Sequence, residues 1–125
     1  MIRWRSHTGA WEATVSDRLA VILASGDPRV LEMGLLYTRN AVKNEWMAEV
    51  RLYLFGPSEV VAATDPGLHD LLKGVLDEGV TPVACKYCSD KYSVSERLAE
   101  LGCEIEYVGQ PISEAIRQGY TPMVW

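Results

Sequence analysis

The stretch LAVILA, residues 19–24, is an uninterrupted run of apolar side chains. It is closed by Ser25, Gly26, Asp27 and Pro28, residue types that favour a turn. A strand that is apolar at every position is typical of a parallel sheet, because such a strand is buried on both faces. The stretch therefore predicts a buried strand of a parallel sheet.

Predicted helices and strands alternate along the rest of the chain. Further strands are expected over residues 50–55, 80–85, 103–108 and 121–125, and helices over residues 30–46, 66–78, 94–101 and 112–118. Strict alternation implies parallel strands joined by crossover helices on both faces of the sheet. We therefore predict an α/β fold, a three-layer Rossmann-like or flavodoxin-like domain with a mainly parallel five-stranded sheet. Pro82 is a mild conflict inside the third strand, because its missing N–H cannot join a sheet ladder.

Capping residues mark the starts of two predicted helices. Asp65 precedes a proline, an order typical of an N-cap followed by the first helical turn. Ser93 and Glu96 have the spacing of a capping box, although that helix could instead begin at Ser89 or Asp90.

Length and charge narrow the class of protein. A chain of 125 residues predicts one domain with an ordinary core, and residues 1–18 fall outside the strand and helix pattern. We expect an N-terminal arm over residues 1–18 and an α/β domain over residues 19–125. The net charge of -5, without a cluster of basic residues, argues against nucleic acid or an anionic membrane as a partner. The absence of an apolar signal or anchor segment favours an intracellular, cytoplasmic protein.

The candidate chemistry lies in VACKYCSD, residues 83–90. Ligands of an open parallel sheet bind beyond the carboxyl ends of its strands, and among the segments expected there only this one carries a strong nucleophile. Cys85 ends a strand and leads toward a helix, and Lys86 and Lys91 would favour its thiolate together with the helix dipole. The alternative is that Cys85 and Cys88 are small buried residues without chemistry.

A metal site is a weaker interpretation of the cysteine pair. A structural zinc site needs four ligands, and beyond Cys85 and Cys88 the chain offers Cys103, His7 and His69. Cys103 begins its strand whereas Cys85 ends a parallel one, so the two are expected at opposite edges of the sheet. His69 is expected to be a solvated residue at a helix start. A redox pair stays open, because Cys-x-x-Cys before a helix is the local arrangement of thioredoxin-type proteins.

Other motifs contribute little. Asp27 and Glu59 follow two predicted strands and could act as a general acid or base, although a lone acidic residue there more often forms a turn or a cap. No glycine-rich nucleotide fingerprint or P-loop follows any predicted strand. The tryptophans and tyrosines do not interleave with basic residues, so they are expected in the core or in subunit contacts.

Four segments together resemble the DsrE/DsrF-like family of sulfur-relay proteins. They are LAVILASGDP (19–28), VRLYLFGPSEV (50–60), LHDLLKGVLDEG (68–79) and VTPVACKYCSD (80–90). The part CKYCSD is similar to the Cys-Lys-x-Cys-Thr-Asp loop of the YchN-like branch. The resemblance implies a Rossmann-like parallel sheet, no metal or nucleotide cofactor, and assembly into oligomers, commonly trimers or hexamers.

The resemblance also implies sulfurtransferase chemistry. Cys85 matches the cysteine that accepts persulfide sulfur and hands it to a partner protein, so the implied partners are sulfur donor and acceptor proteins. Cys88 matches the second cysteine of the loop, and Asp90 its aspartate. Family members usually continue with a Gly/Ala-Arg-Gly turn, whereas this chain has Lys91, Tyr92 and Ser93, so Lys91 is the nearest substitute for the arginine.

We therefore expect an intracellular sulfur-relay protein with Cys85 and Cys88 in catalytic positions. The expected binding residues are Lys86, Asp90, Lys91, Ser25, Gly26 and Gly56. The apolar chain end MVW, residues 123–125, and the aromatic arm predict a homo-oligomer, a trimer or hexamer. Two alternatives remain: an oligomeric binding module for a small ligand or a partner protein, and a dithiol redox protein.

Overall fold

The apolar run that begins at Leu19 forms the strand β1 (Arg18–Leu23) in the computed structural model, which describes residues 16–125. The other strands are β2 (Glu49–Leu54), β3 (Val83–Cys85), β4 (Glu104–Glu106) and β5 (Thr121–Val124). They form one sheet in the order β4-β3-β2-β1-β5, and every neighbouring pair is parallel. The predicted α/β fold with a parallel five-stranded sheet is confirmed.

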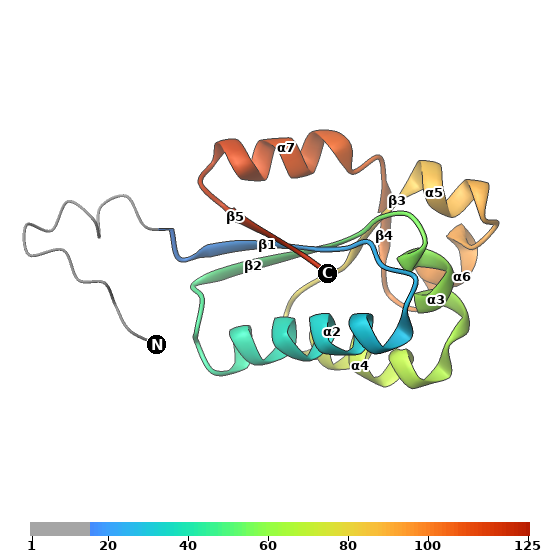
Figure 1. Cartoon of the computed structure of the whole chain (residues 1–125), viewed down its shortest axis with the longest axis horizontal. Coiled ribbons are helices and arrows are strands. Elements are labelled where there is room, and N and C mark those ends of the chain that lie inside the picture. The colour runs from blue at the N-terminus through green and yellow to red at the C-terminus, as the bar shows by residue number, and fades with distance from the viewer. Residues whose placement is uncertain (1–15) are drawn as a thin grey trace, which may run out of the picture.

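Six helices complete the described part of the chain, and they are divided unequally between the faces of the sheet. They are α2 (Pro28–Lys43), α3 (Ser58–Thr64), α4 (Pro66–Asp77), α5 (Lys86–Lys91), α6 (Ser95–Glu100) and α7 (Gly109–Arg117). Figure 1 shows α2 and α4 on one face, α7 on the other, and the short helices α3, α5 and α6 together at the carboxyl end of the sheet. The strand order explains this division. The chain steps in one direction from β1 to β4 and then returns to β5, so a right-handed return crossover places α7 on the opposite face.

Two apolar clusters fill the space between these layers. The larger one lies under α2 and α4 and includes Leu23, Leu31, Leu35, Leu54 and Leu72. The smaller one lies under α7 and consists of Ala20, Ile22, Tyr53, Cys85, Cys88, Val108, Ala115 and Tyr120. Successive residues of β1 alternate between the two clusters, which confirms that this strand is buried on both faces. Both cysteines of the CKYC segment therefore belong to the smaller cluster.

The starts of α2 and α4 are capped by aspartates. Asp27 accepts a hydrogen bond from the backbone N–H of Arg29 at 2.9 Å, and Asp65 accepts one from Gly67 at 2.8 Å. Asp27 also pairs with the Arg29 guanidinium at 3.1 Å, and these hydrogen bonds lower the pKa of the Asp27 carboxyl. The N-cap predicted at Asp65 is confirmed. Asp27 is a cap residue, as its position in a turn indicates, and its carboxylate is already paired.

The predicted capping box at Ser93 is wrong. Helix α6 begins at Ser95 with Val94 as its N-cap residue, and no side chain caps it. Ser93 has a positive φ of 58° and so lies in the tight link between α5 and α6. The helix that precedes this link already begins at Lys86, so the CKYC segment is helical from its second residue and is not a loop.

Two further differences concern strand and helix limits. The strand β3 begins at Val83, after Pro82, because a proline has no N–H for the ladder with β2. Pro82 still accepts a hydrogen bond from the backbone N–H of Glu104 at 2.9 Å. Helix α7 begins at Gly109, three residues before the predicted start at Ile112.

Helix α3 was not predicted at all. It spans only seven residues between Gly56-Pro57 and the cap of α4, which is too short for a clear apolar period. The proline after Asp65 disfavours a helical conformation of that residue, so one helix ends and the next begins at the same position. No helix in the part of the chain that the structure describes has the length and apolar character needed to cross a membrane.

Candidate thiol site

Three reactive side chains meet at the carboxyl end of the sheet. Cys85 is the last residue of β3 and the N-cap residue of α5, and Cys88 lies in the first turn of α5. Glu59 lies in the first turn of α3, directly after β2. Because β2 and β3 are parallel neighbours, their carboxyl ends lie side by side. As a result, the two sulfur atoms and a carboxylate oxygen of Glu59 all lie within 4.8 Å of one another.

This cluster is almost closed to solvent. The exposed fraction is 5% for Cys85, 8% for Cys88 and 0% for Glu59. Neither carboxylate oxygen of Glu59 has a hydrogen-bond partner of good geometry. A buried polar group without a hydrogen-bond partner costs roughly 1–3 kcal/mol in other proteins, and an ionised group costs more. A cost of this kind is typical of a functional site rather than of a structural core.

The carboxyl group of Glu59 has an unusual proton affinity. Burial raises its pKa from 4.5 to about 7, while the Cys88 thiol and the backbone amides of Gly56 and Cys85 lie near enough to stabilise the ionised form and to limit the rise. Glu59 is therefore partly protonated near neutral pH, so it can both accept and release a proton there.

Two of the thiols, those of Cys88 and Cys103, have raised pKa values and are poor acids. Burial raises the pKa of Cys88 to about 11, against an opposing effect of the backbone amide of Gly56. Burial likewise raises the pKa of Cys103 to about 12. Cys103 packs in the larger apolar cluster, just before β4, and is not one of the three groups that meet at the carboxyl end of β3. Both Cys88 and Cys103 are thus protonated near neutral pH.

The lysines of α5 are engaged with other groups. The Lys86 ammonium donates a hydrogen bond to Asp90 at 2.7 Å, which raises the pKa of the lysine and lowers the pKa of the aspartate. The Lys91 ammonium lies 5.8 Å from the centre of the Tyr92 ring. The sequence predicts that these two charges surround a thiolate. In the structure the ionisable group against the sulfur atoms is instead Glu59.

Asp90 links α5 to α6. Its second carboxylate oxygen accepts a hydrogen bond from the Ser95 hydroxyl at 2.5 Å, and the Ser95 oxygen lies 2.6 Å from the hydroxyl of Ser89. Ser89 is fully buried beside Cys88 in the same helix. These contacts tie the last turn of α5, which follows Cys88, to the start of α6.

The other expected binding residues lie in the two neighbouring loops. Ser25 accepts a hydrogen bond from the backbone N–H of Asp27 at 3.0 Å. The α-carbon of Gly26 faces Pro57 so closely that an added Cβ would lie 3.2 Å from the proline ring, so the two loops pack together. Gly56 has a positive φ of 72°, and its backbone amide faces Glu59 and Cys88. A binding role for these residues, and for Lys86, Asp90 and Lys91, stays a prediction.

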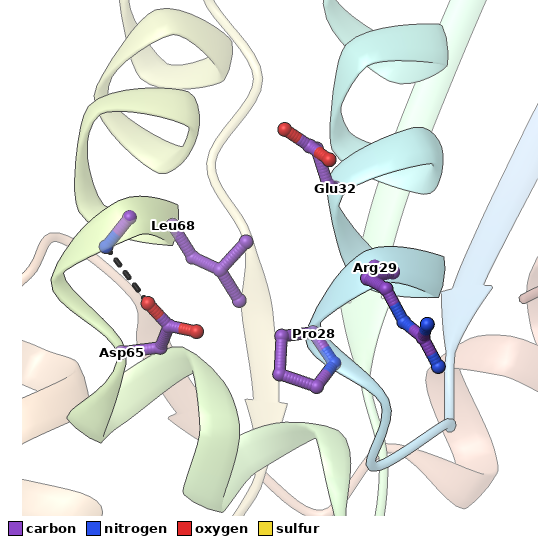
Figure 2. A pocket seen from close by; sticks show the side chains of 6 residues that line it. Pro28, Arg29, Glu32, Asp65 and Leu68 are labelled. Carbon is purple, nitrogen blue, oxygen red and sulfur yellow. Dashed lines mark hydrogen bonds between the residues drawn. The ribbon is translucent and has the colours of Figure 1, made fainter.

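A surface hollow of about 150 Å³ lies elsewhere, between the starts of α2 and α4 (Figure 2). It is lined by Pro28, Arg29, Glu32, Asp65, Gly67 and Leu68. Its Asp65 carboxylate caps α4, and its arginine is paired with Asp27. None of the predicted site residues lines this hollow, so it gives no support for a ligand site there.

The donor atoms of the thiol site also bear on the metal question. Two thiolates and one carboxylate are ligand types that zinc accepts, but a closed structural zinc site needs a fourth ligand. His69 does not supply it, because it is not part of the cluster. It lies in the first turn of α4, as predicted, but it is half-buried and its Nε2 atom has no hydrogen-bond partner among the described residues, so it is less solvated than expected. His7 lies outside the described residues.

The all-parallel five-stranded sheet between two helical layers places the chain, by its fold, among the three-layer α/β proteins. Three solved structures share this fold over most of their length. The conserved protein of unknown function BT1422 from Bacteroides thetaiotaomicron has a TM-score of 0.80 and 24% identity, and the match covers 87% of this chain and 95% of that one. The ychN protein from E. coli has a TM-score of 0.69 and 19% identity over 86% of this chain and 99% of that one. The protein of unknown function MTH1491 from Methanobacterium thermoautotrophicum has a TM-score of 0.67 and 15% identity over 86% and 98%.

No family model matches the sequence, and no curated protein matches it. The likeness to the ychN protein confirms the fold that the resemblance implied, and at these identities it concerns the fold alone.

Sequence reasoning missed that Glu59 joins the two thiols. The sequence does contain a signal for this contact: Glu59 follows the strand 50–55, and consecutive strands of such a sheet are usually neighbours. Their carboxyl ends then lie at one edge, which brings Glu59 and Cys85 together. The unpredicted helix α3 is what turns the glutamate side chain inward.

Proposed function

We propose that this chain is a sulfur-relay protein of the DsrE/DsrF-like type, which carries persulfide sulfur on Cys85 and passes it to a partner protein. The observation that carries the proposal is the buried cluster at the carboxyl end of β3. There the Cys85 sulfur, the Cys88 sulfur and a carboxylate oxygen of Glu59 all lie within 4.8 Å of one another. The fold shared with the ychN protein supports it. Cys85 ends its strand at the sheet edge where ligands of parallel sheets bind.

The proposed reaction is a thiol exchange. The Cys85 sulfur attacks the outer sulfur of a donor persulfide, the donor leaves as a thiol, and Cys85 becomes a persulfide. An acceptor cysteine then attacks that outer sulfur and restores the Cys85 thiol. An exposed fraction of only 5% would shield the sulfur from small oxidants between the two steps.

Exposed aromatic residues support a protein partner at this edge. Phe55 follows β2, Tyr87 lies in the first turn of α5, and Tyr107 follows β4, so all three stand near the carboxyl ends of neighbouring strands. Tyr87 and Tyr107 are 64% and 63% exposed. Exposed apolar and aromatic side chains that gather on one surface often mark a protein contact. We propose that the sulfur donor and acceptor proteins dock here.

Self-assembly into a trimer or hexamer is a further part of the proposal. The edge strand β5 leaves one side of its backbone unpaired within the described residues and carries the exposed Val124. Light scattering of the purified protein measures the mass directly, and a monomer would contradict this part.

Intact mass after reaction with a persulfide donor tests the relay. We expect a gain of about 32 Da, one sulfur atom, in the wild type and in Cys103→Ser, a control thiol outside the cluster. Cys85→Ser should show no gain. An adduct that survives Cys85→Ser, or its absence from the wild type, overturns the proposal.

A dithiol redox protein is the second candidate. The observation in its favour is that the sulfur atoms of Cys85 and Cys88 lie within 4.8 Å of each other, so a modest movement would bring them to bonding distance. Mild oxidation followed by alkylation and a gel shift separates the two candidates. A reversible disulfide in the wild type, without any sulfur adduct from a persulfide donor, would favour the redox function.

A further inference from the structure

We propose that Glu59 is the proton acceptor of the thiol site and that the Cys88 thiol carries the proton to it from Cys85. The inference rests on the proposed function, since it assigns the proton that must leave Cys85 during sulfur transfer. It also assigns a role to Cys88, for which the sequence leaves a redox pair with Cys85 and a packing residue without chemistry open.

The geometry of Glu59 is that of a catalytic residue. Its carboxylate is fully buried, lacks a hydrogen-bond partner of good geometry and lies within 4.8 Å of the reacting sulfur atoms. A structural glutamate in a core is normally paired with a cation or with several donors. The cation that follows Cys85 in the sequence, Lys86, is paired with Asp90 instead. The carboxylate is therefore free to receive a proton from a thiol.

The thiol of Cys88 lies within 4.8 Å of both other groups. It interacts with the carboxyl group of Glu59 and with the thiol of Cys85, and the backbone amide of Cys85 also lies near the carboxyl group. A thiol that keeps its own proton near neutral pH can pass a proton on by accepting one while donating another. Cys88 meets this condition, because its pKa is raised to about 11.

In the part of the chain that the structure describes, no charged group near Glu59 competes with it as the proton acceptor. The titratable groups that face it are thiols: Cys85 and Cys88 from the end of β3 and from α5, and Cys103 from the residue just before β4. No charged side chain of α2, α4 or α6 contributes to the shift of its pKa. Within the described residues, Glu59 is thus the group at the site whose proton affinity suits exchange near neutral pH.

The step balances without an oxidant or a metal ion. As the Cys85 sulfur bonds to the outer sulfur of the donor persulfide, its proton passes to Cys88 and the proton of Cys88 passes to Glu59. The sulfur–sulfur bond of the donor breaks, and its electron pair leaves with the donor sulfur. That thiolate then takes the proton from Glu59. The products are the Cys85 persulfide and the donor thiol, and Glu59 is ionised again.

The pH profile of Cys85 labelling tests the inference without any persulfide. A neutral aromatic disulfide such as dithiodipyridine reacts with a thiol by the same proton balance, and intact mass follows the first adduct on Cys85. In the wild type we expect the rate to rise through about pH 7, where Glu59 ionises, and then to level off. Glu59→Gln should lose this inflection and react about tenfold more slowly near neutral pH.

Matched variants separate proton transfer from structure. Glu59→Asp should keep the inflection in part, because it keeps a carboxylate. Glu96→Gln, at an exposed glutamate of α6, should match the wild type. Cys88→Ser retains a hydroxyl that can pass a proton and should stay within a few-fold of the wild type, whereas Cys88→Ala should fall to the level of Glu59→Gln. Circular dichroism and thermal unfolding verify that each variant is folded.

A direct titration covers the case in which Glu59→Gln does not fold. Carbon-13 NMR of glutamate-labelled wild-type protein should show one carboxyl group that titrates near neutral pH and that shifts when Cys85 is labelled. The inference is overturned if no glutamate titrates there, if Glu59→Gln keeps the wild-type profile, or if one equivalent of bound zinc makes Glu59 a metal ligand. If Cys85 labelling shows the expected inflection near pH 7 but no persulfide adduct forms, the sulfur-relay function is rejected, while Glu59 is still supported as the proton acceptor of Cys85.

Discussion

The ammonium of Lys86 lies 2.7 Å from the carboxylate of Asp90, one helical turn further along α5. The lysine next to Cys85 is therefore held by an aspartate that also binds Ser95 at 2.5 Å. An ion pair of this kind on a helix surface contributes little to stability. Its significance lies in the electrostatics of the thiol site, because the positive charge beside Cys85 is already balanced.

The first prediction concerns this balanced charge. Lys86→Met should change the labelling rate of Cys85 by less than about threefold near neutral pH, because Asp90 already screens the ammonium group. The measurement is the rate of adduct formation on Cys85 by intact mass. Lys73→Met is the matched control, since Lys73 forms the same type of pair with Asp77 in α4. A tenfold drop confined to Lys86→Met would show that the lysine activates the thiol.

The second prediction concerns stability and pH. The pKa of Glu59 is about 7 in the folded protein and near 4.5 in the unfolded chain, so both states are protonated in strong acid and the group contributes no difference there. As the pH rises from about 4.5 to 7, the unfolded chain loses this proton while the folded protein retains it, so the free energy of unfolding falls. Above that range the loss is complete and constant, on the order of 3 kcal/mol.

Glu59→Gln removes this dependence. The variant should gain stability relative to the wild type as the pH rises through the same range, and urea unfolding at several pH values measures the difference. Comparison of the two proteins cancels the titration of their other carboxylates. A stability difference that does not change with pH would mean that Glu59 has an ordinary pKa.

The third prediction contrasts the two expected caps. Asp65→Ala should lower the free energy of unfolding by about 1 kcal/mol, because it removes the side-chain acceptor for the backbone N–H of Gly67. Ser93→Ala should cost less than about 0.5 kcal/mol, because Ser93 does not cap α6. Chemical unfolding of both variants decides. An equal loss of stability at the two positions would mean that Ser93 caps a helix in solution after all.

The fourth prediction concerns Tyr120, which is buried at the far end of the smaller apolar cluster. Its hydroxyl donates a hydrogen bond to Glu49 at 2.6 Å, and the guanidinium of Arg51 lies 4.3 Å from the centre of its ring. Tyr120→Phe retains the ring but loses the hydrogen bond, so we expect a loss of about 1 kcal/mol. Tyr87→Phe, at an exposed ring, serves as the control and should be neutral. A neutral effect at Tyr120 would mean that water replaces the Tyr120 hydroxyl as the partner of Glu49 at no cost.

The sequence patterns predicted the strands that are buried on both faces and the helices with long apolar stripes. For β1 the continuous apolar run was sufficient, and for α4 the cap at Asp65 fixed the start. The weaker elements were predicted less well, because local signals compete there. Pro82 shortened β3 to three residues, and α3 is too short for a periodic pattern.

The thiol site was predicted in part. Cys85 stands at the end of β3, as expected from the apolar strand before it. Its electrostatic surroundings were not predicted, because they depend on which strand lies beside β3 and on how α3 turns Glu59 inward. Two lysines close in sequence were weighed above a carboxylate 26 positions away, yet the sheet brings the carboxylate to the sulfur atoms.

The brevity of β3 and β4 has a consequence for access to the sulfur. Each strand spans three residues, and β2 and β3 align at two positions, against six between β1 and β2. Local opening of a sheet requires less free energy where fewer hydrogen bonds between strands must break, and amide hydrogen exchange measures such opening. This side of the sheet can therefore open while β1 and β2 stay paired. A thiol that is nearly closed in the resting protein can meet a large partner through such an excursion, without unfolding of the rest of the chain.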